Sequence, residues 1–300
     1  MKYKFNFFPA DQIKFNSLPF AENTLQLIND YFRNHFGKKY GVVTNNGREA
    51  MSLLFKHLGL KKEDEIFITT TFDYPNVSSC VTCTVFNYCK PSRVMTNHTK
   101  AIFVIHEFGV MHPELENLRL IANDRKIPLI EDCAHTFLSK NQSGVTSGSI
   151  GDWVIISFPK FYPVNNGGML LGNEIFNTET KCNTTILDDM SIVFHELPFN
   201  FDYAKKRIEI SHLLLKGICQ NRIQPLLKEN DFESVPWFFP IEVDQPEEYI
   251  LKLRSMGIES GLWHGSNVIV IPLHQYFTNG DIKEAVSIFN KINNGSGKKF

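Results

Sequence analysis

Two strongly apolar segments of the chain each end in side chains that could take part in acid–base or amine chemistry. The segment IPLIED delivers the acidic pair Glu131 and Asp132, and WVIISFPK delivers Ser157 and then Lys160. Adjacent side chains of a strand point to opposite faces, so Glu131 and Asp132 should face different ways. A lysine that follows an apolar strand is expected in a pocket, where its pKa is depressed and its amine can react.

A carboxylate at one strand end and a lysine at the next is the combination that a pyridoxal-phosphate (PLP) enzyme needs. The amine of Lys160 could form a Schiff base with the cofactor. The carboxylate of Asp132 could hold the pyridine nitrogen protonated, so that the ring acts as an electron sink. Taken alone, Asp132 could equally cap a helix, and a lone lysine is more often a solvated charge. Together they favour a cofactor pocket.

A glycine turn in NNGREAM could bind the cofactor's phosphate. It stands where a helix should begin, and exposed amides at a helix start form an anion site. Gly47 and Arg48 are therefore candidate phosphate contacts, and Ser157 could donate a hydrogen bond to the same group. An ordinary strand-to-helix turn is an equally good interpretation of this motif by itself.

Aromatic and histidine side chains near the strand ends are candidates for contact with a planar ring. His135 lies three residues after Asp132 and could stack on the ring or hydrogen-bond its oxygen, although an ordinary core or surface histidine is the alternative. Phe72 and Tyr74 follow another strand and are both candidates to stack on the ring; we expect one of the two in the core, either assignment fits the sequence, and Phe72 is named as the cofactor contact. We interpret His106 as a packed histidine at a strand end.

Strand-like and helix-like segments alternate through the first 175 residues. We expect strands at KYGVVT, EIFITTTF, KAIFVI, IPLIED, WVIISF and GGMLLG, and helices over residues 21–37, REAMSLLFKHL and PELENLRLIANDRK, with a weaker one from about Pro75. This alternation predicts an α/β domain with a mostly parallel sheet. Ligands of such sheets gather at the carboxyl ends of the strands, where the candidate residues fall.

The pattern changes after residue 175. We expect a helix over AKKRIEISHLLLKGICQNRIQPLL, a strand at VPWFFPIEV, a helix at PEEYILKLRSMG, a strand at NVIVIPL and a closing helix at DIKEAVSIFNKI. The prediction is a large cofactor-binding domain over 1–175 and a smaller α/β domain over 176–300, on which the N-terminal segment could also pack.

Composition excludes several classes of function. The 300 residues contain 31 Lys+Arg and 32 Asp+Glu, a formal charge of −1 with no long block of one sign, which gives no electrostatic case for nucleic acid or an anionic membrane. No apolar run reaches the ~18 residues of a spanning helix. The first residues lack the apolar core of a signal peptide, so we expect a cytoplasmic protein.

The six cysteines are expected to be reduced structural thiols. Cys80 and Cys83 have the CxxC spacing of half a zinc site, but no second pair follows at a suitable distance, so we predict no metal site.

Taken in order, these segments resemble the DegT/DnrJ/EryC1/StrS family of sugar aminotransferases, which have the fold type I architecture of PLP enzymes. NNGREAM is similar to the family's NGTxAL turn, TKAIFVIHEFG to TKAIIPVHLYG, IPLIEDCAH to LIEDAAQ or LIEDAAH, and SGSIGDWVIISF to GSxGDxxxFSF. The similarity continues through PWFFPIEV and PLHQYFTNGDI near the C-terminus and so covers most of the chain.

The resemblance implies roles for the matched positions. Lys160 would be the Schiff-base lysine and proton carrier, and Asp132 the partner of the pyridine nitrogen. His135 would lie near the ring. Family members are homodimers with shared sites, and Asn200 resembles the residue that reaches the neighbouring subunit's phosphate. The implied reaction moves an amino group, with glutamate as donor, to a keto sugar linked to a nucleotide, in surface polysaccharide or amino-sugar biosynthesis.

Several departures keep two alternatives open. The serine-to-lysine spacing is two residues shorter than in the common family form, Arg48 replaces a threonine, and Asn166 replaces an acidic residue. The part beyond Gly168 is shorter than in typical members. One alternative is another PLP chemistry on a smaller substrate, such as dehydration or decarboxylation. The other is a catalytically inactive scaffold of the same fold.

Overall fold

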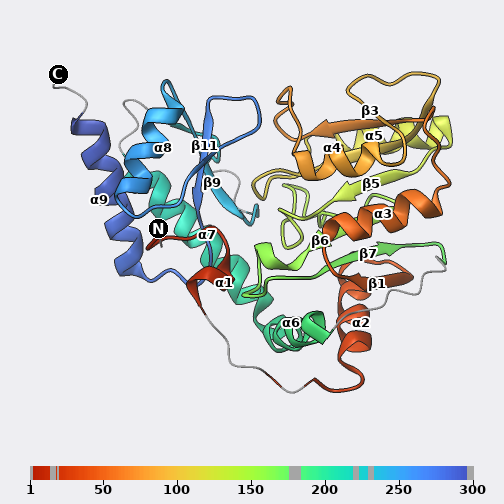
Figure 1. The fold of residues 1–300 in the computed structure, drawn as a ribbon, viewed down its shortest axis with the longest axis horizontal. Coiled ribbons are helices and arrows are strands. Elements are labelled where there is room, and N and C mark those ends of the chain that lie inside the picture. Colours follow the sequence, from red (N-terminus) through yellow and green to blue (C-terminus); the bar gives the residue numbers. More distant parts are fainter. Residues whose placement is uncertain are drawn as a thin grey trace.

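Two sheets of different size form the framework of the molecule. The computed structural model describes residues 3–13, 18, 20–175, 184–218, 223–228 and 233–295. Figure 1 shows two parts side by side: one contains the larger sheet and its helices, and the other contains the smaller sheet with α8 and α9. The N-terminal segment, with α1, lies against the smaller part.

The larger sheet has seven strands in the order β1-β7-β6-β5-β4-β2-β3. Their bounds are β1 (Tyr40–Thr44), β2 (Glu65–Thr70), β3 (Lys90–Ser92), β4 (Thr99–Ile105), β5 (Leu129–Asp132), β6 (Trp153–Ser157) and β7 (Gly168–Gly172). Neighbouring strands from β3 to β6 pair in parallel, whereas β7 is antiparallel to both β6 and β1. The predicted mostly parallel sheet is confirmed.

The antiparallel β7 follows from the length of the connection before it. Only residues 158–167 join β6 to β7, and they include the short 3-10 helix η1 (Phe158–Lys160). Parallel neighbours need a crossover of about a dozen residues or more. The tight return leaves Lys160 in a short connection between two buried strands.

Helices cover both faces of this sheet, which explains its uniformly apolar strands. On one face, α3 (Gly47–His57) and α4 (Ser79–Phe86) pack against a core that includes Phe103 and Ile155. On the other face, α5 (Leu115–Arg125) packs on Ile102 and Val104, and α2 (Thr24–Phe36) packs on β6.

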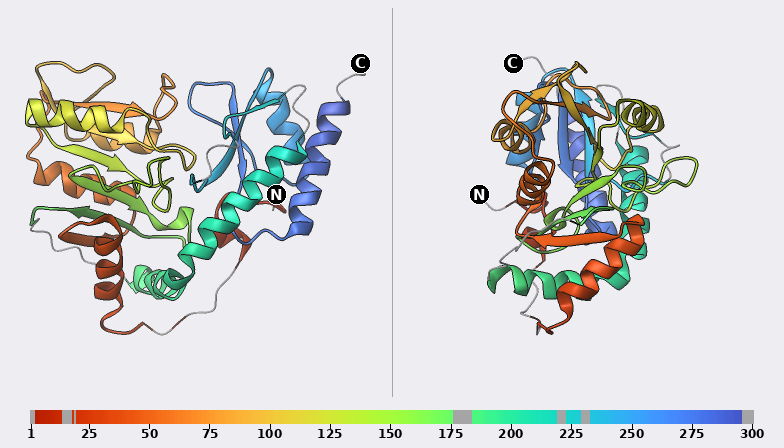
Figure 2. Two further views of the ribbon diagram at one scale, coloured as in Figure 1. Left: turned by 180° about the vertical axis from the view of Figure 1, so that it is seen from behind. Right: turned by 90° about the vertical axis from the view of Figure 1, so that its right-hand side faces the viewer.

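The smaller sheet is antiparallel and has the order β10-β11-β9-β8. Its strands are β8 (Ile223–Pro225), β9 (Phe238–Val243), β10 (Gly261–Leu262) and β11 (Val268–Pro272), and its helices are α8 (Pro246–Ser255) and α9 (Asn279–Gly295). Figure 2 shows the long α7 (Asn200–Gly217) extending from the region of α6 across the smaller part of the molecule toward α9. Two further helices complete the described elements, α1 (Pro9–Gln12) and α6 (Thr184–Glu196), together with η2 (Leu197–Phe199).

One predicted helix is too long. The stretch from residue 204 to 227 was expected to be helical throughout, but α7 ends at Gly217 and residues 223–225 form β8. The backbone of β8 pairs with β9, and Pro225 is tolerated because β8 is an edge strand. Tertiary pairing therefore overrides the local helical pattern at this end.

The N-terminal segment is fastened to the smaller sheet's side of the molecule. Phe5 forms a bridge with Ile258, and the amide of Lys4 donates to the carbonyl of Gly257 at 2.8 Å. The proposed division into 1–175 and 176–300 remains a prediction. Within the described residues, no helix is long and apolar enough to cross a membrane.

Candidate active site

A cavity of about 470 Å³ lies where the carboxyl ends of β4, β5 and β6 approach the smaller sheet. Six of the residues predicted from the sequence line it, namely Gly47, Arg48, Asp132, His135, Ser157 and Lys160. They come from three separate segments of the chain, and the sheet brings them together. Its volume lies within the range of roughly 300–1,000 Å³ that is typical of ligand sites.

Lys160 is placed at this cavity by the turn after β6. The strand ends at Ser157, and the single turn of η1, which begins at Phe158 and includes Pro159, carries the lysine. The Nζ atom lies 4.5 Å from the centroid of the Trp237 ring. Burial lowers the pKa of Lys160 to about 8, against the opposing influence of the Asp132 and Cys80 charges. Such an amine is neutral in a useful fraction near physiological pH.

Asp132 presents a buried carboxylate to the same cavity. The Ala134 amide donates to its Oδ1 atom at 3.0 Å, which fixes the orientation of the group. Burial raises the pKa of Asp132, and the charge of Lys160 opposes that rise. The carboxylate is thus held by the fold close enough to the lysine for their charges to interact.

Glu131 faces away from the cavity, as the alternation of a strand predicts. Its carboxylate accepts hydrogen bonds from the Gly148 amide at 2.8 Å and the Ile150 amide at 3.0 Å, and it pairs with His106 at 2.9 Å. Burial alone would raise the pKa of Glu131, but the bonds from His106 and the backbone amides outweigh burial and lower it. His106 is therefore a packed structural histidine, as expected.

The glycine turn before α3 has a defined geometry. The Asn46 side chain caps the helix by accepting from the Glu49 amide at 3.1 Å. A Cβ atom at Gly168 would lie 2.6 Å from the Gly47 nitrogen, so β7 can approach this turn only with a glycine there. A Cβ atom placed on Gly47 would lie 3.7 Å from the Cβ atom of Ser157. The helix start and the serine therefore adjoin each other.

His135 lies among the aromatic side chains of the cavity wall. Its ring centroid is 4.4 Å from that of Trp237 and 5.7 Å from that of Trp263. Burial, with the charges of Lys160 and His264, lowers its pKa well below the ordinary value, so the ring is neutral. Its buried Nδ1 atom has no hydrogen-bond partner in the described part of the chain.

Two predicted residues do not line the cavity. Phe72 is half-buried and packs against the core residue Phe108, with ring centroids 5.6 Å apart. Asn200 is buried; its Nδ2 donates to the Tyr31 hydroxyl at 2.9 Å and its Oδ1 accepts from the Tyr162 hydroxyl at 2.8 Å. Its suggested role toward a neighbouring subunit remains a prediction.

Other residues of the cavity were not predicted from the sequence. Trp237 and Trp263 come from the smaller sheet's segments, and their local patterns indicate only buried aromatics. Glu107 is buried and accepts from the Phe72 amide and from Trp263 Nε1, each at 3.0 Å. The sequence signal for Glu107 is its position in TKAIFVIHEFG, where the family's similar segment TKAIIPVHLYG has a leucine. Burial raises the pKa of Glu107.

The cysteines contribute one thiol to this site. Cys80, Cys83, Cys89 and Cys133 are free, and Cys80 lines the cavity; Cys182 and Cys219 lie outside the described residues.

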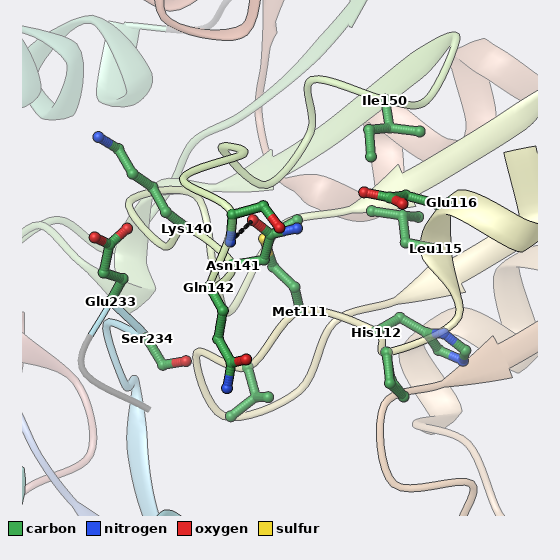
Figure 3. A pocket seen from close by; sticks show the side chains of 13 residues that line it. Met111, His112, Leu115, Glu116, Lys140, Asn141, Gln142, Ile150, Glu233 and Ser234 are labelled. Carbon is green, nitrogen blue, oxygen red and sulfur yellow. Dashed lines mark hydrogen bonds between the residues drawn. The ribbon is translucent and has the colours of Figure 1, made fainter. Parts of the chain in front are cut away.

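A second cavity, of about 640 Å³, lies beside residues 140–143 and is lined by none of the predicted site residues. Figure 3 shows Lys140 and Glu233 extending to one side of it and Glu116 to the other.

Comparison with known proteins accounts for this arrangement. Residues 21–187, more than half of the chain, match the DegT/DnrJ/EryC1/StrS aminotransferase family. The chain belongs to this family. It is 28% identical over 168 residues to the GDP-perosamine synthase of Escherichia coli O157:H7, covering 51% of this chain and 45% of that protein. It is 25% identical over 169 residues to the 3-oxo-glucose-6-phosphate:glutamate aminotransferase of Bacillus subtilis strain 168, covering 52% and 35%. The chain thus spans less than half the length of these curated relatives.

Solved structures share the fold across nearly the whole chain. The aminotransferase TlmJ from Streptoalloteichus hindustanus superposes with a TM-score of 0.76 at 15% identity and covers 93% of both chains. Spr1654 from Streptococcus pneumoniae, solved in a PLP form, gives a TM-score of 0.77 at 15% identity and covers 97% and 96%. The predicted fold type I architecture is confirmed.

Proposed function

We propose that the protein is a PLP-dependent aminotransferase that moves an amino group from glutamate to a keto sugar, with a nucleotide-linked sugar as the preferred form. The observation that carries the proposal is the pairing of Lys160 and Asp132 in one cavity. Burial lowers the pKa of the lysine to about 8, while the carboxylate is held nearby by the Ala134 amide. Surface polysaccharide or amino-sugar biosynthesis is the setting that such a reaction serves.

The residues of the cavity fit PLP. Lys160 supplies an amine of lowered pKa, and the buried Asp132 supplies a carboxylate for the pyridine nitrogen. The turn at Gly47 and the neighbouring Ser157 offer donors for a phosphate, with the exposed Arg48 at the same wall. The orphaned Nδ1 atom of His135 supplies a polar group that a bound ring oxygen could satisfy.

When bound, PLP supplies an electron sink that makes the α-proton of an amino acid acidic. The chain's own residues then have defined tasks. Lys160 would take up this proton at its Nζ atom and then give it back, a task that suits an amine with a pKa near the working pH. Asp132 holds the positive charge of the ring nitrogen. Trp237 covers the lysine and keeps water from its amine.

Sugar substrates are supported by the relatives. The Escherichia coli protein is named for GDP-perosamine, and the Bacillus subtilis protein for 3-oxo-glucose 6-phosphate with glutamate. Spr1654 has been solved in both PLP and PMP forms. These names belong to those proteins, and they favour a keto sugar and an amino donor as the substrates of this cavity.

We propose a homodimer as the working form. Exposed aromatic side chains gather around η2, where Phe199 is 43% exposed and Phe201, at the start of α7, is 80% exposed. Phe194 of α6 adds a third. Burial of such a patch against a second copy would remove apolar surface from water.

The test is isotope transfer between the two substrates. Purified protein loaded with PLP should convert ¹⁵N-glutamate to 2-oxoglutarate in an amount equal to the enzyme when no acceptor is present, as ping-pong kinetics require. Addition of nucleotide-linked keto sugars should then give a ¹⁵N-amino sugar. Uptake of PLP without 2-oxoglutarate would favour a dehydratase or decarboxylase. Absence of PLP binding would favour the inactive scaffold.

A further inference from the structure

Arg207 is the most deeply buried cation among the described residues, and its surroundings are unusual. Its side chain on α7 is 0% exposed, and no carboxylate in the described part of the chain pairs with it. Burial lowers the pKa of Arg207 to about 9. A buried charge without a counter-ion is costly to the folded state, so its retention calls for a reason beyond packing.

The guanidinium is satisfied entirely by neutral acceptors from three segments. Its Nε donates to Gln275 Oε1 at 2.7 Å, and its Nη1 donates to the carbonyls of Pro236 at 3.0 Å and Leu273 at 3.3 Å. Its Nη2 donates to the backbone carbonyl of Lys160 at 3.1 Å. One side chain thus joins the lysine's own backbone to two segments of the smaller sheet.

Gln275 binds the residue that follows Lys160 in the chain, Phe161. Its Nε2 atom donates to the Phe161 carbonyl at 2.7 Å while its Oε1 accepts from Arg207. The guanidinium carbon also lies 4.5 Å from the Phe161 ring centroid. Two consecutive carbonyls at the end of η1 are therefore held by one connected pair, which we call the Arg207–Gln275 clamp.

The same clamp reaches the aromatic cover of the amine. Arg207 binds the carbonyl of Pro236, and the next residue is Trp237, whose ring lies 4.5 Å from Lys160 Nζ. The backbone below the lysine and the backbone of its cover are thus fixed by one planar group. The fork of an arginine can do this, whereas the single ammonium of a lysine cannot reach four acceptors in three directions.

We propose that Arg207, with Gln275, is the positioning residue for Lys160. The clamp fixes the backbone of Lys160 relative to the backbone that carries Trp237, so that the amine stays against the Trp237 ring inside the cavity. The inference rests on the proposed function only in taking Lys160 as the reactive amine. Arg207 acts through backbone carbonyls and has no contact of its own with the reacting atoms.

The test measures the amine itself, without cofactor or substrate. Reductive methylation of the apoprotein between pH 6 and 10, followed by peptide mass spectrometry, gives the labelling midpoint of Lys160 and of every other mapped lysine. The titratable groups that influence Lys160 are Asp132, Cys80 and His135. They are unchanged in the variants, so any movement of the midpoint reports the environment of the amine.

Arg207→Lys keeps the charge and removes the fork. We expect the Lys160 midpoint to rise by at least about one pH unit as water reaches the loosened amine, while the midpoints of exposed lysines stay fixed. Arg125→Lys is the matched control, because Arg125 is exposed and donates to a backbone carbonyl, that of Thr96, away from the cavity. It should leave the Lys160 midpoint in place.

Gln275→Met is the second variant and covers the case in which Arg207→Lys does not fold. Methionine adds no charge near the amine and removes both the donor to the Phe161 carbonyl and the acceptor for Arg207, so this variant should shift the same midpoint in the same direction. In PLP-loaded protein, either variant should lower kcat about tenfold or more with little change in the KM of the donor. An unshifted Lys160 midpoint in a folded variant would overturn the proposal, even if its melting temperature fell. Because labelling needs no PLP, this result stands apart from the fate of the proposed function.

Discussion

The Nζ atom of Lys160 lies 4.5 Å from the centre of the Trp237 ring, so an amine at the end of one sheet is covered by an indole that precedes a strand of the other. A ring face at this distance favours the charged form of an amine. Burial acts in the opposite direction and prevails, since the pKa of Lys160 falls to about 8. The cover therefore acts mainly by excluding water.

Replacement of Trp237 by alanine should raise the pKa of Lys160. Desolvation is the largest cause of the lowered value, and loss of the indole admits water to the amine. The midpoint of Lys160 labelling should move from about 8 toward the ordinary 10.5. Trp237→Phe keeps a ring and should stay near the wild-type midpoint. Equal midpoints in the alanine and phenylalanine variants would show that the cover does not control solvation.

Removal of the lysine should stabilise the fold in a pH-dependent way. The folded pKa of about 8 lies below the ordinary 10.5, so the unfolded chain binds more protons between these values, and wild-type stability rises with pH there. Lys160→Met should therefore unfold at higher urea concentration than wild type at pH 7, with a gain that shrinks above pH 8. The exposed Lys100→Met should show no such trend. A gain that is constant with pH would point to packing instead of charge.

Asp132→Asn should slow the reaction without preventing cofactor binding. The neutral amide cannot hold a positive charge on the ring nitrogen, and loss of one aimed electrostatic group costs about 10²–10³-fold in rate. Stopped-flow measurement of the glutamate half-reaction gives the effect directly. The same change should also lower the pKa of Lys160, because the carboxylate raises it. Asp124→Asn, on the exposed side of α5, serves as the control and should react at the wild-type rate.

Glu131→Gln should weaken the fold. The carboxylate pairs with buried His106 and accepts from the Gly148 and Ile150 amides, so an amide there leaves donors facing donors. Breaking such a buried pair costs roughly 3–5 kcal/mol of unfolding free energy. The exposed Glu116→Gln should change it by less than about 0.5 kcal/mol.

The effect of Glu131 should also depend on pH. Its folded pKa is lowered below the ordinary 4.5, so its contribution is fully present above that value and is lost as pH falls through the folded pKa. Urea unfolding at pH 7 and at a series of pH values below 4.5 follows this loss. A difference between wild type and Glu131→Gln that grows on acidification would contradict the assignment.

The sequence predicts the part of the site that strand ends deliver. Asp132, Ser157 and Lys160 each follow an apolar strand, and parallel strands place their carboxyl ends on one edge. The direction of Glu131 also follows, because side chains alternate along a strand. These inferences rest on local sequence patterns, and the strands of the folded sheet keep the side-chain directions that the patterns predict.

Residues supplied by long-range packing were out of reach of the sequence. Trp237 and Trp263 reach the cavity from segments more than 70 residues beyond Lys160. Phe72 follows a strand as a cofactor contact should, yet it packs half-buried against Phe108 and does not line the cavity. Arg207 stands in a helix that looks amphipathic and charged, and only the tertiary structure shows the four acceptors around it.

The central claim is that Lys160 is the amine that binds the cofactor and gives it up to an amino donor. Borohydride reduction of PLP-loaded protein followed by peptide mapping tests both parts at once, because reduction fixes a Schiff base where it stands. We predict a pyridoxyl group on Lys160 alone, and its loss when glutamate is added before the borohydride. A pyridoxyl group on another lysine, or labelling of Lys160 that glutamate leaves unchanged, would contradict the account.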